Sequence, residues 1–317
     1  MAEPREETQM MRQLVAACGA VAMVMMLMPS INASRQSKWS EWSEPVNLGG
    51  VINTSFSEAS PAISRDGLSL YFVSNRLGVP PDAFGDQDLY VARRESVDLP
   101  WDWPVNLGAN INTAAFEGFP ALSRNEHHLF FSRTSGDVRA PGDIWVSYRK
   151  NVHDDLGDGG WQLPVPLGPG VNTSDSEGGP AYFENRKRGL PQLFFNSLRP
   201  GSALTDIYVA DAFGSAVPVN ELNSAGTDAD PSITADGLEI FFYSNRTGSA
   251  GNDLYSSMRK SVLEPWSKPE PLGPIVNTTA SENLGAISPD GETLFFTSTR
   301  AGGFGSNDIY VTTRTKH

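Results

Sequence analysis

Five carboxylates at equivalent positions of a repeated pattern are the residues of this chain best suited to take part in binding or catalysis. Each lies five residues after an asparagine, in the pattern Asn-Thr-x-x-x-Glu or Asn-Ser-x-x-x-Asp, and the five are Glu58, Glu117, Glu177, Asp228 and Glu282. Four arginines recur after an apolar run in the same way: Arg76, Arg199, Arg246 and Arg300. Gathered around one axis, the acids could hold a cation or a sugar. Two carboxylates about 5 to 9.5 Å apart are also what glycoside hydrolysis needs.

The carboxylates and arginines also have a purely structural interpretation. Residues that recur in every copy of a repeat are expected to stabilise each copy, here by pairing carboxylate with arginine or with the backbone amides of a turn. We therefore favour a structural role for these positions and assign no catalytic residue. The ligand-binding role stays open beside it.

The elements that position these residues belong to a repeat. The asparagines lie at 53, 112, 172, 223 and 277, so successive copies are 51 to 60 residues apart. Each copy continues with a short strand-like segment, a turn, an apolar run such as Leu70-Tyr71-Phe72-Val73, and an Asp-Ile/Leu-aromatic segment. A Trp-x-x-Pro segment precedes four of the five asparagines. Four short strands in each copy predict an all-β fold in which neighbouring copies cover one another's faces.

The last copy carries a family resemblance. Its sequence, SPDGETLFFTSTRAGGFGSNDIYV at 288–311, resembles the WD40-like repeat of the TolB type, called PD40, and the first and fourth copies share the pattern. The resemblance implies a β-propeller. TolB itself has a further α/β domain and a six-bladed propeller, and neither that domain nor a sixth repeat occurs in this chain. The function of TolB is therefore not carried over.

Five copies predict a five-bladed β-propeller with four-stranded blades. The final strand, Asp308 to Thr313, would be left with an open edge that invites aggregation. A spare strand at the start of the chain, Trp42 to Leu48, is expected to pair with it and to close the ring. The up-and-down order of strands in a blade should bring the recurring carboxylates and arginines to one face.

The N-terminus predicts export. The apolar run Leu14 to Met28 has about the length of a signal-peptide core and is short for a membrane span. We interpret residues 1–33 as a signal peptide or N-terminal anchor and residues 34–317 as a single propeller. The protein is then expected in the periplasm or outside the cell, with membrane attachment only through a possible anchor. Cys18 lies within the apolar run, so the propeller needs no disulfide.

Departures from the repeat are the expected place for an asymmetric ligand. In the second copy Ser123-Arg124-Asn125-Glu126 replaces the Asp-Gly turn, and Ser135 stands where the arginine would fall, although Arg133 could substitute. The third copy has a longer, basic turn that contains Arg186, Lys187 and Arg188. These breaks suggest unequal blades.

The net charge and the sequence motifs exclude some classes of function and favour others. A net charge of −13 without a basic stripe argues against nucleic acid. We predict no cofactor and no metal, with calcium at Asp154, Asp155 and Asp158 as a weak alternative. The favoured hypothesis is an exported, non-enzymatic, monomeric binding or scaffold module for a protein or a cell-envelope polysaccharide. The alternative is a carbohydrate-active enzyme, similar to a glycoside hydrolase, that uses carboxylates of the central funnel.

Overall fold

The computed structural model describes residues 38–76, 87–134, 142–156 and 160–317, apart from the side chain of Leu284. The chain divides into two units, Met1–Lys38 and Trp39–His317. Every strand lies in the second unit, and no α-helix occurs among the described residues. Within the same residues, nothing helical has the length and apolar character needed to cross a membrane.

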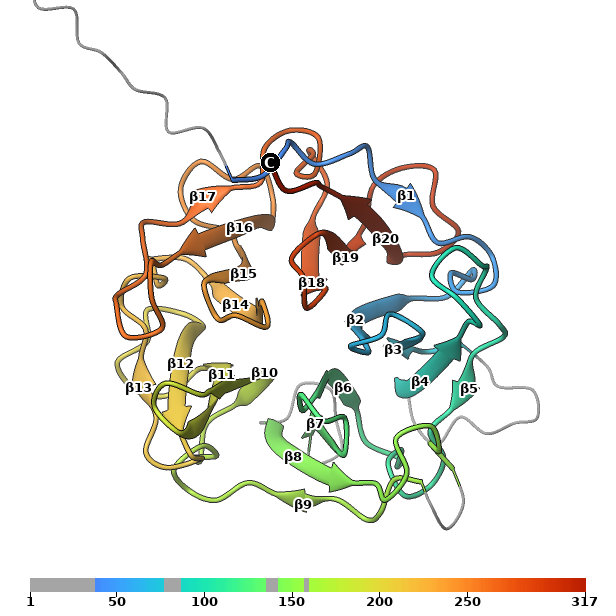
Figure 1. Ribbon diagram of the computed structural model, residues 1–317, viewed down its shortest axis with the longest axis horizontal. Helices are drawn as coiled ribbons and strands as arrows, with labels where there is room; N and C mark the ends of the chain where they lie inside the picture. Colours follow the sequence, from blue (N-terminus) through green and yellow to red (C-terminus); the bar gives the residue numbers. More distant parts are fainter. Residues whose placement is uncertain (1–37, 77–86, 135–141, 157–159) are drawn as a thin grey trace, which may run out of the picture. The chain divides into compact units, whose positions relative to one another are not determined.

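The second unit is a five-bladed β-propeller of four-stranded antiparallel blades, as predicted (Figure 1). Four blades follow the chain from the inner to the outer strand. They are β2 (Glu58–Ile63), β3 (Ser69–Ser74), β4 (Asp88–Arg93) and β5 (Val105–Asn106); β6 (Glu117–Leu122), β7 (His128–Thr134), β8 (Gly142–Tyr148) and β9 (Val165–Pro166); β10 (Glu177–Asn185), β11 (Leu190–Ser197), β12 (Asp206–Asp211) and β13 (Val217–Pro218); β14 (Asp228–Ile233), β15 (Glu239–Ser244), β16 (Asp253–Met258) and β17 (Glu270–Pro271).

The fifth blade joins the two ends of the second unit. It contains β18 (Glu282–Ile287), β19 (Thr293–Ser298) and β20 (Asp308–Thr313), and its outer strand is β1 (Val46–Asn47). Val46 pairs with Val311 in antiparallel register. Asn53 adds a side-chain bond, donating from Nδ2 to the carbonyl oxygen of Ile309 at 2.9 Å. The open edge of the last strand is therefore covered by the start of the propeller, which confirms the predicted closure.

The core lies between the blades, and the apolar runs supply it from both faces. In β3, Leu70 and Phe72 pack in a cluster that contains Phe295 of the preceding blade around the ring. Tyr71 and Val73 face the other way and pack with Phe131 of the next blade. Because both faces of a second strand are buried, its sequence is continuously apolar instead of alternating.

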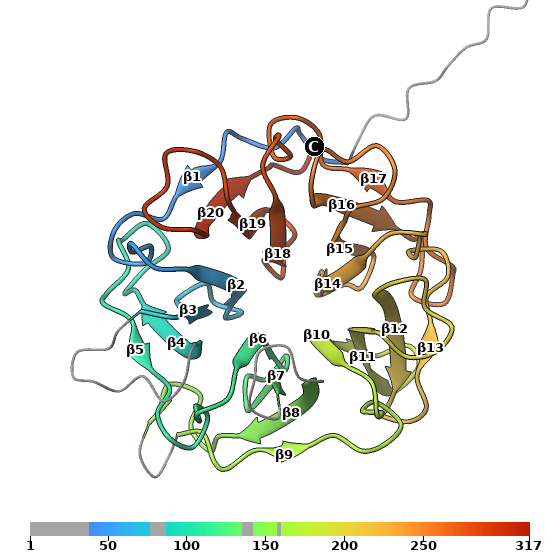
Figure 2. The same ribbon diagram turned by 180° about the vertical axis from the view of Figure 1, so that it is seen from behind.

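The inner strands surround the centre of the ring in both views of the molecule (Figures 1 and 2). Each inner strand is interrupted by a register shift in its pairing with the second strand, for example between Ala59 and Ala62. A bulge of this kind bends a strand and re-aims a side chain. At the bulge, Ser60, Phe119 and Asp230 have φ of 52°, 55° and 52°, which is a left-handed conformation uncommon outside glycine.

Candidate functional site

The five recurring carboxylates are buried beside the starts of the inner strands. Glu177 illustrates their surroundings. It accepts hydrogen bonds from Thr173 N at 2.8 Å, Thr173 Oγ1 at 2.7 Å and Ser197 Oγ at 2.8 Å. Arg199 adds a fourth bond from Nη2 at 3.2 Å. The carboxylate is 1% exposed and most of its acceptor capacity is used within its own blade.

The same arrangement recurs around the ring. Each carboxylate has one arginine partner; the pairs are Arg76–Glu58 at 3.3 Å, Arg133–Glu117 at 2.8 Å, Arg199–Glu177 at 3.2 Å, Arg300–Glu282 at 3.2 Å, and Arg246–Asp228. Arg133 fills the position in the second blade, and Ser135 lies outside the described residues. The five carboxylates are essentially inaccessible, at 0% or 1% exposure.

Each arginine of these pairs is held by more than its carboxylate. The guanidinium of Arg199 lies 5.3 Å from the ring centre of Phe195 and 4.7 Å from that of Tyr208. It also donates to the carbonyl oxygen of Val171 at 2.6 Å. Arginine over aromatic rings is a stabilising contact, and it recurs in all five blades. The acid–arginine pairs therefore tie together the strands of one blade.

Burial affects the protonation of the acids at this face. Desolvation raises the pKa of Glu117 above its ordinary value, although Thr113 and Arg133 oppose the shift. Asp143, Asp206 and Asp253 have raised pKa values for the same reason, and each also feels the negative charge of the recurring acid of the next blade. These groups lose protons less readily because both burial and a like charge disfavour the ionised form.

The blades differ from one another in the residues that lie nearest the propeller axis. At the bulge of the inner strand the blades carry different residues, which are Ser60, Phe119, Gly179, Asp230 and Leu284. The first four, together with the residues that follow them, line a small cavity of about 40 Å³. We call this cavity the neck of the central channel. Asp230 is its acidic lining residue among the described side chains.

Asp230 is a carboxylic acid held in its neutral form. The residue is 8% exposed, and desolvation raises the pKa of its side chain from 3.8 to about 8. Its backbone N–H donates to Asn196 Oδ1 at 3.2 Å. Tyr243 lies nearby, and burial followed by the charge of ionised Asp230 raises the pKa of its hydroxyl. No arginine or lysine bonds to Asp230 among the described residues, in contrast to the recurring acids.

A larger cavity of about 170 Å³ opens at the face formed by the turns between the inner and second strands. We call it the turn-side mouth. It shares with the neck the residues Pro61, Pro120, Pro180, Pro231 and Gly285, so the two cavities are continuous parts of one channel. Its charged lining residues are Arg65, Arg124, Glu126 and Glu184. The mouth lies opposite the face that carries the recurring acids, where sequence analysis had placed the ligand.

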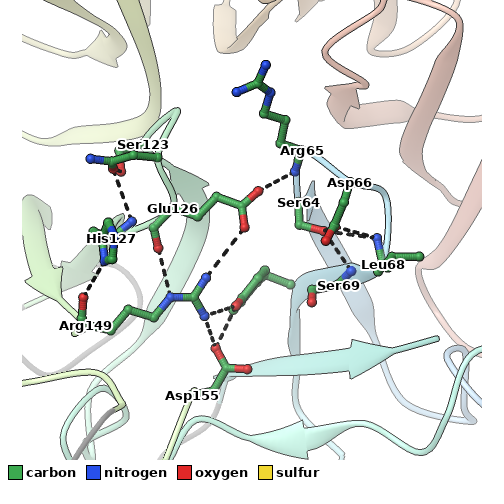
Figure 3. A network of polar contacts seen from close by, with 12 residues as sticks. Ser64, Arg65, Asp66, Leu68, Ser69, Ser123, Glu126, His127, Arg149 and Asp155 are labelled. Carbon is green, nitrogen blue, oxygen red and sulfur yellow. Dashed lines mark hydrogen bonds and ion pairs between the residues drawn. The ribbon is translucent and has the colours of Figure 1, made fainter. Parts of the chain in front are cut away.

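Glu126 shows how the second blade departs from the others. It occupies the position of the turn glycine, equivalent to Gly67, and adopts φ of 60°. Its carboxylate accepts from the backbone N–H of Arg65 at 2.5 Å and lies 3.8 Å from Arg149 Nη2 (Figure 3). The strain of a left-handed glutamate is therefore offset by a bond to the neighbouring blade.

A buried polar network supports this corner of the mouth. Arg149 donates from Nη1 to Asp155 Oδ1 at 2.6 Å and to Tyr71 OH at 2.8 Å (Figure 3). Tyr71 donates to the same carboxylate at 2.6 Å, and Trp161 Nε1 donates to it at 3.1 Å. Asp155 is thus engaged by protein donors instead of standing free for calcium, and Asp158 lies outside the described residues. No group of three or more potential metal ligands occurs among the described side chains.

Sequence reasoning missed Asp230 and placed Glu126 only as a break in the turn. The sequence nevertheless distinguishes both residues from their equivalents in the other repeats. Asp230 is an acid at a repeat position that holds serine, phenylalanine, glycine and leucine elsewhere, and Glu126 is an acid at a glycine position.

Comparison with known proteins gives the fold and a set of neighbours. No protein-family model and no curated protein matches the chain. A thermostable family-43 glycoside hydrolase superposes with a TM-score of 0.56 at 14% identity, covering 83% of this chain and 91% of that one. An α-L-arabinofuranosidase from Lactobacillus brevis gives 0.58 at 11% identity, with 84% and 92% covered. A TolB from Agrobacterium tumefaciens, described as putative in that structure's name, gives 0.48 at 17% identity, with 84% and 81% covered.

Glycoside hydrolases outnumber TolB among these similar structures, and they match over nearly their whole length. At such low identity the likeness establishes the five-bladed fold. The hypothesis of a non-enzymatic binding or scaffold module was nevertheless wrong by this comparison, since the neighbours favour the carbohydrate-active alternative.

Proposed function

We propose that this protein is a carbohydrate-active, glycoside hydrolase-like enzyme that takes a glycan into its central channel. Two observations support the proposal. The five-bladed fold is shared with a family-43 glycoside hydrolase and an α-L-arabinofuranosidase. The channel contains a neutral carboxylic acid at an axial position where each blade carries a different residue.

Asp230 is the observation that carries the proposal. Cleavage of a glycosidic bond needs an acid that gives a proton to the departing sugar oxygen while water adds to the anomeric carbon. A carboxylic acid performs this role near neutral pH only if its pKa is raised, and burial without a cationic partner raises it. A pKa of about 8 keeps Asp230 protonated at pH 7. We assign it the role of proton donor.

The recurring acids are less suited to that role. Glu177 is buried, accepts four hydrogen bonds and is paired with Arg199. Such contacts use most of the acceptor capacity of the carboxylate and leave no room for a sugar oxygen. Hydrolysis also requires a second carboxylate. The candidates are Glu126 and Glu184, which line the turn-side mouth.

The remaining features extend the proposal. We interpret the blades as PD40-type repeats of the TolB kind, residues 1–33 as the export signal or anchor, and residues 34–317 as a periplasmic or extracellular propeller. Its substrate would be a cell-envelope or other extracellular polysaccharide. Nucleic acid is not part of the proposal. The proposed hydrolysis uses no cofactor, and we propose a monomer.

The test is an activity screen of the exported propeller, residues 34–317, with arabinan, xylan and cell-envelope polysaccharides, following the release of reducing ends. Wild-type protein should cleave at least one glycan. Asp230→Asn should lower kcat by about a hundredfold or more, since general acid catalysis contributes factors of this size. Glu126→Gln and Glu184→Gln identify the second carboxylate by the same assay.

The matched control is Asp102→Asn, the same chemical change at an exposed residue near the outer strand of the first blade. It should leave activity unchanged. If no glycan is cleaved by folded wild-type protein, or if Asp230→Asn retains full activity, the enzymatic proposal is refuted.

A further inference from the structure

The turn-side mouth has a polarised wall. At the position after Ser64 and Ser123 the first two blades place Arg65 and Arg124, which line the cavity. The equivalent positions of the fourth and fifth blades are Ala235 and Pro289, which also line it. One side of the opening is therefore cationic and the opposite side is apolar.

The third blade extends the cationic side. Its turn between β10 and β11 begins beside Glu184, a residue of the cavity wall, and contains Arg186 and Lys187, both exposed. We call Arg65, Arg124, Arg186 and Lys187 the basic arc. Arg188 is not included, because its Nη1 lies 3.1 Å from Asp211 Oδ2.

Most of the arc lacks an internal counter-charge. Among the described residues, no hydrogen bond or ion pair joins the charged group of Arg65, Arg186 or Lys187 to another side chain. Figure 3 shows the Arg65 side chain directed away from the network around Glu126. Arg124 lies 3.8 Å from Glu184, and both side chains are partly exposed. Glu126, the other acid of the wall, faces the buried Arg149. The guanidinium of Arg65 is therefore available at the cavity wall to an anionic ligand, with Arg186 and Lys187 exposed beside it, on a chain whose net charge is −13.

From this polarised wall we infer that the turn-side mouth binds an anionic glycan, a polysaccharide that carries uronic acid carboxylates. The arginines of the basic arc would meet the carboxylates, since the guanidinium matches their geometry. The apolar wall of Ile233, Ala235, Ile287 and Pro289 would meet the faces of the sugar rings. The inference rests on the proposed function, because it names the substrate class for the same channel.

The position of the mouth next to the neck is consistent with an anionic glycan as the ligand. The mouth is continuous with the neck through the ring of shared prolines, and a neutral Asp230 at the neck adds no repulsion toward an anionic chain. A flexible acidic peptide would also be drawn to the arc. The apolar side of the opening, formed by Ile233, Ala235, Ile287 and Pro289, favours a sugar ring, and an acidic peptide serves as a competing probe in the test.

The test measures binding of oligogalacturonate and of an uncharged arabino-oligosaccharide of equal length to the propeller by calorimetry. The variant is Arg65→Ala with Arg124→Ala, and the control is Lys260→Ala with Lys268→Ala, which removes the same charge at exposed residues that do not line the cavity. We expect oligogalacturonate to bind more tightly than the neutral sugar. Its affinity should fall about tenfold or more in the arginine variant, and less than about twofold in the control. Salt raised from about 0.05 M to about 0.5 M should also weaken it.

The outcomes separate this inference from the proposal beneath it. Equal affinity for the charged and the neutral sugar, unchanged by the arginine variant, overturns the anionic assignment and leaves the proposed function standing. Equally strong competition by polyglutamate overturns the glycan assignment, because the arc then selects charge alone. If folded protein binds neither sugar, the inference is overturned, and the proposed function is refuted as well only if no glycan of the activity screen is cleaved.

Discussion

Replacing Asp230 with asparagine should make the stability of the protein less sensitive to pH. In the folded protein the carboxyl keeps its proton up to about pH 8, because the site is buried and offers it no cationic partner. In the unfolded chain the proton leaves near the ordinary value of 3.8. Between these two values unfolding releases a proton, so rising pH favours the unfolded state.

The size of the effect follows from the two pKa values. Each pH unit within the window changes the free energy of unfolding by about 1.4 kcal/mol. From pH 5 to pH 7 the wild-type protein should lose about 3 kcal/mol relative to Asp230→Asn. Asparagine matches the neutral acid in shape and cannot ionise, so its stability should lack this contribution.

Urea unfolding at several pH values from about 5 to about 7.5 measures the difference between the two proteins. Subtracting the free energy of unfolding of the variant from that of the wild type removes the contributions of titrating groups that the substitution leaves unaffected. Asp102→Asn, the exposed control, should run parallel to wild type. Parallel curves for Asp230→Asn as well would show that Asp230 is already ionised when folded, and would remove the physical basis for its role as a proton donor.

Three further changes test the architecture. Glu177→Gln should destabilise the third blade by about 1–3 kcal/mol in chemical denaturation, because Arg199 loses its charged partner within a buried network; an unchanged midpoint would contradict the structural role. Arg149→Met should cost about 1–3 kcal/mol, because buried Asp155 loses one of its two arginine partners and keeps only Arg93, and differential scanning calorimetry should show the lowered Tm. Removing residues 39–48 should lower the Tm strongly by exposing the edge of the last blade, and unchanged melting would show that the closure is dispensable.

Much of the architecture could be predicted from the sequence because it is repeated. Five copies of one pattern imply five equivalent units, and a unit with two apolar faces must lie between two others. The position of the spare strand followed from the same counting. The pairing of Glu58 with Arg76 was also within reach, since an up-and-down blade brings the two segments to one end.

The candidate site was harder to predict for the same reason. Repetition draws attention to shared residues, which turned out to be buried ion pairs, while the chemistry of the axis depends on the residue that differs in each copy. Asp230 looks unremarkable as one acid among many in a chain with 37 acidic residues. Its environment depends on the bulge of its inner strand and on residues of the other blades that line the neck with it.

The sequence alone therefore determined the all-β class, the five units, the order of strands and the closure of the ring, because hydrophobic pattern and repeat spacing act locally or between neighbours. Only the tertiary structure decided which acid is neutral on the axis, and that Arg65 and Arg124 share one opening. Those properties depend on burial and on the meeting of side chains from different blades. Burial sets the free energy of ionisation, and the spacing of residues along a chain does not specify it.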